Sequence, residues 1–111
     1  MISIETLKNY GANVEEGLTR CMNKESFYIM LIHKVLSDNK IDQLEKAISE
    51  KNLDEAFEIA HALKGMYANL SLDPITKPVV EMTELLRSRS DVDYSALLAE
   101  AQSQFAKLKA L

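Results

Sequence analysis

Residues that interrupt helices are scarce in this chain. Its 111 residues include only 3 glycines and 2 prolines. Because these are the residues that most often break regular structure, their scarcity favours long uninterrupted helices over many short strands. The apolar fraction of 47% and the charged fraction of 27% are typical of a soluble globular protein. The sequence therefore predicts a single all-α domain over residues 1–111.

Apolar periodicity divides the chain into helices. Tyr28, Leu31, Ile32 and Val35 stand at the i, i+3, i+4 and i+7 spacing of one buried helical face. Similar patterns predict helices over 3–10, 14–22, 24–36, 40–50, 53–70, 73–89 and, after a cap at 90 or 91, up to 109. Because every connection is short, successive long helices are expected to run antiparallel. We predict an antiparallel up-and-down four-helix bundle with additional short N-terminal helices.

Charge and cysteine content exclude several classes of protein. The net charge is −4 without any basic run, whereas nucleic-acid binding needs a concentrated positive surface. The longest apolar run, residues 27–32, is far shorter than the roughly 20 residues of a membrane span. No signal peptide is visible, and the single cysteine, Cys21, excludes an internal disulfide, so we expect a cytoplasmic protein. Cys21, His33 and His61 lack metal-ligand spacing, and no acid/base pair indicates an enzyme.

The segment 53–70 is the most informative of the predicted helices. At about 100° per residue, its core face is expected to consist of Ile59, Leu63, Met66 and Leu70. His61 points away from that face. We expect Tyr67 at the edge of the core and His33 to be an ordinary helix residue.

The surroundings of His61 are unusual for a solvated helix surface. Phe57 precedes it by one turn, Lys64 and Gly65 follow it by one turn, and Ala68 comes next on the same face. Glycine inside a helix costs about 0.5–1 kcal/mol relative to alanine, yet here it leaves clear space beside the imidazole. An accessible imidazole with a free lone pair and a nearby cation suits a nucleophile that another protein must reach.

The order His61-Ala62-Leu63-Lys64-Gly65, followed by Ala68-Asn69-Leu70, resembles the signature of histidine-containing phosphotransfer (HPt) domains. One departure is visible at Ser71, where the family usually has glycine. That position ends the helix, so we expect altered termination and intact chemistry.

The resemblance implies a phosphoryl carrier without an ATP site or cofactor of its own. His61 would be the phosphoacceptor, Lys64 would neutralise charge on the transferring group, and Gly65 would allow close approach of the partner. The partners would be a response-regulator receiver domain, which supplies the acidic pocket and Mg²⁺, and a sensor or hybrid histidine kinase. A bundle that binds a receiver domain without accepting phosphate is the alternative.

Candidate docking residues lie on two of the predicted helices. The 24–36 helix carries more apolar residues than one core face needs. The surplus residues are Ile29, Met30 and Leu36, and we expect them in an exposed patch. Phe57 is expected either to dock the partner with Ala68 or to lie under the N-terminal helices. Because this relay face must stay open, we expect a monomer.

Overall fold

The computed structural model describes residues 1–111 and contains seven helices and no strand. The helices are α1 (Ile4–Tyr10), α2 (Val14–Arg20), α3 (Glu25–Leu36), α4 (Lys40–Ser49), α5 (Leu53–Asn69), α6 (Asp73–Arg87) and α7 (Ser95–Lys109). The predicted all-α fold is confirmed. Only α7 begins clearly later than expected, because the Asp93 carboxylate accepts the Ser95 backbone N–H at 2.9 Å and sets the start of the helix there.

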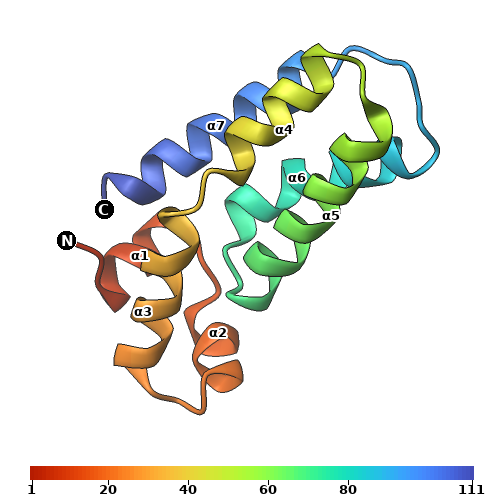
Figure 1. Cartoon of the computed structure of the whole chain (residues 1–111). Helices are drawn as coiled ribbons and strands as arrows, with labels where there is room; N and C mark the ends of the chain where they lie inside the picture. Colours follow the sequence, from red (N-terminus) through yellow and green to blue (C-terminus); the bar gives the residue numbers. More distant parts are fainter.

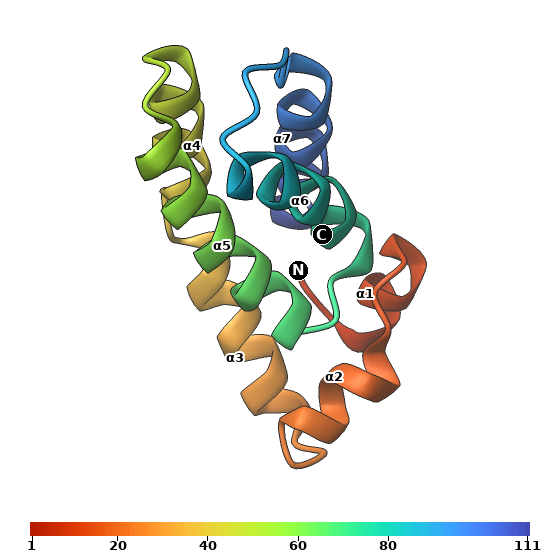
Figure 2. The same ribbon diagram turned by 90° about the vertical axis from the view of Figure 1, so that its right-hand side faces the viewer.

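Helices α4 to α7 form the antiparallel bundle (Figures 1 and 2). Each packs mainly on its neighbour in the chain, α4 on α5, α5 on α6 and α6 on α7. α7 returns beside α4, where the Gln102 side-chain amide donates a hydrogen bond to the Glu45 carboxylate. This arrangement follows from the short connections, which leave successive helices no other way to bury their apolar faces.

The core face of α5 differs in part from the sequence prediction. Leu63 and Leu70 are buried as expected, but Ile59 and Met66 are only half-buried. The remaining positions of the buried face are held by Ala56, Ala60 and Tyr67. Because α5 packs against both α4 and α6, its buried face is centred on the alanines, which allow the helices to approach closely. Tyr67, expected at the edge of the core, is 1% exposed.

Helices α1 to α3 extend the bundle at the carboxyl end of α5 instead of forming a further layer around it (Figure 1). The Asn13 backbone N–H donates to the Ser71 carbonyl at 2.9 Å, which ties the start of α2 to the connection between α5 and α6. The molecule is accordingly elongated, with extents of 41 × 24 × 19 Å. None of its helices is long and apolar enough to cross a membrane.

Candidate functional site

Helix α5 carries His61 near its middle, where the backbone is held on both sides by regular helix. The helix begins at a reciprocal cap: the Asn52 side-chain oxygen accepts the Glu55 backbone N–H at 3.3 Å, and the Asn52 amide donates to the Glu55 carboxylate at 2.9 Å. Asp54 and Glu55 in the first turn suit the positive end of the helix dipole. No proline interrupts α5 before it ends at Asn69.

The face of α5 that bears His61 lies on the surface. His61 and Gly65 are exposed, and Lys64 and Ala68 are half-buried. A Cβ placed on Gly65 would meet no atom within 4 Å, so the space beside His61 is open. Lys64 takes part in none of the ion pairs, which leaves its ammonium group free to meet an anion.

Phe57 stacks on the imidazole of His61. The two ring centroids are 5.7 Å apart and the ring planes differ by 22°. The guanidinium carbons of Arg87 and Arg89 lie over the same phenyl ring, at 5.2 and 4.8 Å from its centroid. Phe57 is therefore covered by arginines at the end of α6, and the prediction that the N-terminal helices cover it is wrong.

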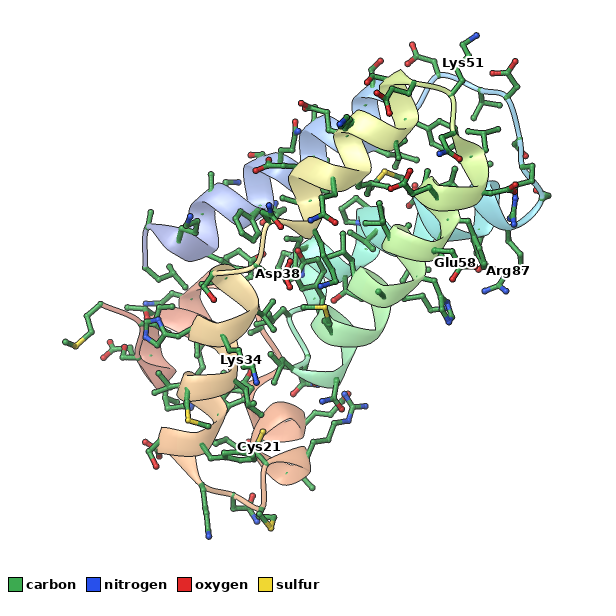
Figure 3. All side chains as sticks on the ribbon, viewed as in Figure 1. Cys21, Lys34, Asp38, Lys51, Glu58 and Arg87 are labelled. Atoms are coloured by element: carbon green, nitrogen blue, oxygen red, sulfur yellow. The ribbon has the colours of Figure 1, made fainter.

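Arg87 and Arg89 are neighbours of the site that the sequence analysis missed. They follow His61 by more than 25 residues and reach it only because α6 runs back along α5, so that its carboxyl end meets the first turns of α5. Figure 3 shows Arg87 on the side of the α5–α6 pair that also carries Glu58. A helical wheel of α5 alone contains no signal for them.

Ser71, where the resemblance implies glycine, lies at the carboxyl end of α5. Ser71 has φ 56°, in the left-handed region that favours glycine. Its hydroxyl donates to the Glu16 carboxylate at 3.1 Å and accepts from the Arg20 guanidinium at 3.2 Å, and Arg20 also donates to the Ala68 carbonyl at 2.6 Å. These bonds from α2 offset the conformational cost. The backbone therefore ends α5 in the left-handed conformation that glycine would adopt, and the expected change lies in the side-chain contacts instead of the backbone.

Tyr28 of α3 holds the same helix end from inside the core. Its hydroxyl donates to the Leu70 carbonyl at 2.8 Å. Burial, with smaller contributions from Cys21 and Asp73, raises the pKa of Tyr28 to about 12, so the phenol keeps the proton that it donates. The ring fits because residue 17 has no side chain: a Cβ on Gly17 would lie 2.6 Å from ring atoms of Tyr28. Cys21 is buried beside this contact as a free thiol, and Figure 3 shows it between α2 and α3.

The candidate docking residues of α3 do not form one exposed patch. Met30 is 54% exposed and Ile29 is half-buried, but Leu36 is only 6% exposed and belongs to the core. The prediction for Leu36 is wrong: its side chain lines the same hollow as Ile2 and Leu111 from the two chain ends, which a wheel of α3 alone does not include. The part of α3 that adjoins α5 is instead the turn of Leu31 and Lys34, which borders a hollow of about 260 Å³ at the carboxyl end of α5.

The remaining histidine lies apart from these features. His33 is exposed on α3 and borders the hollow between the two chain ends. No three histidine, cysteine, aspartate or glutamate side chains are grouped so that they could hold a metal ion.

The four-helix bundle presents His61 on an open face of α5, as the resemblance to phosphotransfer domains implies. The family model of the Hpt domain matches residues 34–111, which is more than half of the chain and includes α4 to α7 with His61. The chain therefore belongs to the Hpt domain family, whose members act as phosphocarriers in two-component signal transduction. No curated protein and no solved structure matched the chain. The match leaves α1, α2 and most of α3 outside the family region.

Proposed function

We propose that this protein is a relay in which His61 receives a phosphoryl group from the phospho-aspartate of a receiver domain, or from a sensor kinase, and passes it on. The observation that carries the proposal is the exposed imidazole in the middle of α5 beside the open space at Gly65. The absence of a side chain at Gly65 leaves room beside the nucleophile for a partner to approach. The whole chain, residues 1–111, acts as one domain, because α1 to α3 hold the end of the helix that carries His61.

In the proposed transfer, a phosphorus–oxygen bond of the donor is replaced by a phosphorus–nitrogen bond to His61. A nitrogen lone pair of His61 attacks the phosphorus of the acyl phosphate, the phosphorus–oxygen bond breaks, and the aspartate leaves as a carboxylate. The imidazole gives up its N–H proton as the adduct forms, and the reverse step returns the phosphoryl group. Lys64, free of acidic partners, neutralises charge on the transferring group.

The partner supplies what this chain does not bring to the reaction. Since phosphoryl transfer depends mostly on positioning and electrostatic stabilisation, the receiver domain contributes its acidic pocket and Mg²⁺. We place the protein in the cytoplasm as a monomer, acting on receiver domains and a sensor or hybrid histidine kinase without an ATP site of its own. Phe57, Ala68, Ile29 and Met30 are the proposed docking contacts.

The test is transfer of label from a phosphorylated receiver domain in the presence of Mg²⁺. We expect acid-labile, base-stable label on the native chain and on His33→Gln, and none on His61→Gln. His33→Gln is the matched control because His33 is the other histidine, also exposed on a helix. If receiver domains bind the chain but none passes label to His61, the relay is refuted and the non-phosphorylated adaptor is the better account.

A further inference from the structure

The side chains of Phe57, Arg87 and Arg89 form a cluster against His61 that neither the family match nor the signature assigns. We propose that this cluster, the arginine–aromatic cluster, stabilises the phosphorylated form of His61. The stack with Phe57 orients the imidazole, and the two guanidinium groups give the phosphoryl group positive charge to interact with. The inference rests on the proposed role of His61 as phosphoacceptor.

Contact distances place imidazole and cations around one ring. The imidazole lies 5.7 Å from the Phe57 centroid, and the two guanidinium carbons lie 5.2 and 4.8 Å from it. A phenyl ring flanked in this way restricts the rotation of the imidazole, since turning the His61 side chain away would lose the stacking contact. Both guanidinium groups thus contact the same phenyl ring that stacks on the imidazole of His61.

The carboxylates that now pair with the two arginines bind them only weakly. Arg87 pairs with Glu84 at 3.3 Å, and Arg89 pairs with Asp54 at 2.6 Å. The arginine side chains are 50% and 41% exposed, and exposed pairs of this kind contribute little to stability. A phosphoryl group brings nearly two negative charges and three acceptor oxygens, and a guanidinium group can bind it through two parallel hydrogen bonds. It is therefore a stronger partner than either carboxylate.

The backbone at Arg89 carries a cost that its side chain offsets. Its φ is 54°, and a non-glycine residue in this left-handed conformation is disfavoured by about 1–2 kcal/mol. Its guanidinium donates to the carbonyls of Leu86 and Arg87 at 2.8 and 3.2 Å, besides its contacts with Asp54 and Phe57. Lys51, two residues after the end of α4, has φ 56°, and its side chain makes no hydrogen bond or ion pair. Arg89 is thus held over Phe57 by a network that Lys51 lacks.

The experiment uses phosphoramidate as a small chemical donor, so it needs no receiver domain. The His61 nitrogen attacks phosphorus, the phosphorus–nitrogen bond of phosphoramidate breaks, ammonia leaves, and the imidazole loses its proton. All variants carry His33→Gln, so that His61 is the only histidine available. Urea unfolding at neutral pH then gives an unfolding equilibrium constant for each form of a variant. The ratio compared is the constant of the unmodified form divided by that of the phosphorylated form.

The expected result is a larger ratio in the native background than in Arg87→Gln/Arg89→Gln, by roughly threefold or more for two half-exposed charge interactions. Because the ratio compares two forms of one variant, any general loss of stability from removing the Arg89 contacts cancels. The control for general loss of positive charge is Lys77→Gln, which removes one charge from an exposed lysine on α6 ten residues before Arg87 and should leave the ratio unchanged. Arg87→Lys/Arg89→Lys should recover part of the ratio, because charge returns without the planar donor group.

An equal ratio in the native background and in the double glutamine variant would overturn the inference. A fall of the same size in Lys77→Gln would also overturn it, because the effect would then be one of general charge. Failure of the proposed relay would be seen in a different experiment, in which no label passes from receiver domains to His61. That experiment does not use the arginine variants.

Discussion

Gly17 on α2 and Gly65 on α5 are both interior residues of a helix, where glycine costs about 0.5–1 kcal/mol relative to alanine. A Cβ on Gly17 would lie 2.6 Å from the ring of Tyr28, which is itself fully buried and hydrogen-bonded to Leu70. A Cβ on Gly65 would meet nothing within 4 Å. Packing therefore accounts for the first glycine and not for the second. The proposed relay gives Gly65 a role that packing does not, because the open space beside His61 would admit the partner.

The largest expected effect is at the packed glycine. Gly17→Ala should lower the free energy of unfolding by about 1–3 kcal/mol, because the added methyl group cannot be accommodated without moving the Tyr28 ring. Urea unfolding followed by circular dichroism measures the change. Unchanged stability would show that the α2–α3 contact can relax, and it would remove the contrast between the two glycines.

Tyr28→Phe tests the other side of the same contact. The variant leaves the Leu70 carbonyl without its buried partner, so we expect a loss of about 1.5 kcal/mol in the free energy of unfolding. Of the three Tyr28 atoms closest to a Cβ at Gly17, the two ring carbons remain in phenylalanine and only the hydroxyl oxygen is lost. A double-mutant cycle with Gly17→Ala should therefore give a non-zero coupling energy. Strict additivity would contradict the proposed contact between the two residues.

Ser71→Ala should destabilise the fold by about 1 kcal/mol, because it removes the hydrogen bonds to Glu16 and Arg20 while retaining the left-handed backbone. Ser71→Gly removes the same bonds and the backbone cost together, so its stability should lie closer to that of the native chain. Thermal or urea unfolding of the pair separates the two contributions. If alanine and glycine proved equivalent, the backbone cost at Ser71 would be negligible.

The smallest expected effect has the opposite sign. Gly65→Ala should raise the free energy of unfolding by about 0.5–1 kcal/mol, because the helix gains propensity and the methyl group meets no neighbour. The same urea measurement applies. A destabilised variant would mean that Gly65 serves the fold after all, and it would make the two glycines alike.

The sequence was sufficient to predict the number and order of the helices and the open face around His61. Both depend on local patterns: apolar spacing within one helix, short connections, and small residues one turn after the histidine. The errors arose where the environment of a side chain is set by elements distant in the chain. Leu36 is buried beside the two chain ends, and Phe57 is covered by Arg87 at the end of α6 and by Arg89 just after it. Periodicity in one helix carries no information about either contact.

Ser71 shows the same limit: the departure from the family signature is visible in the sequence, but the distant contacts that compensate for it are not. The family signature indicated that its side chain would alter how α5 ends, and the position does adopt the conformation that glycine prefers. What compensates for the serine lies about 50 residues earlier, on Glu16 and Arg20, outside the region that the family model matches. Helix α2 thus supplies the contacts that compensate for the serine at this position.

The most direct test of the open face of α5 is the initial rate of label transfer from a phosphorylated receiver domain to Gly65→Leu and to the native chain. Urea unfolding and the helical circular dichroism signal establish that the variant is folded. We expect transfer to be roughly tenfold to a hundredfold slower, because a side chain beside His61 keeps the reacting groups apart. A folded Gly65→Leu protein that accepts the label at the native rate would contradict the claim that the open space at Gly65 is where a partner approaches His61.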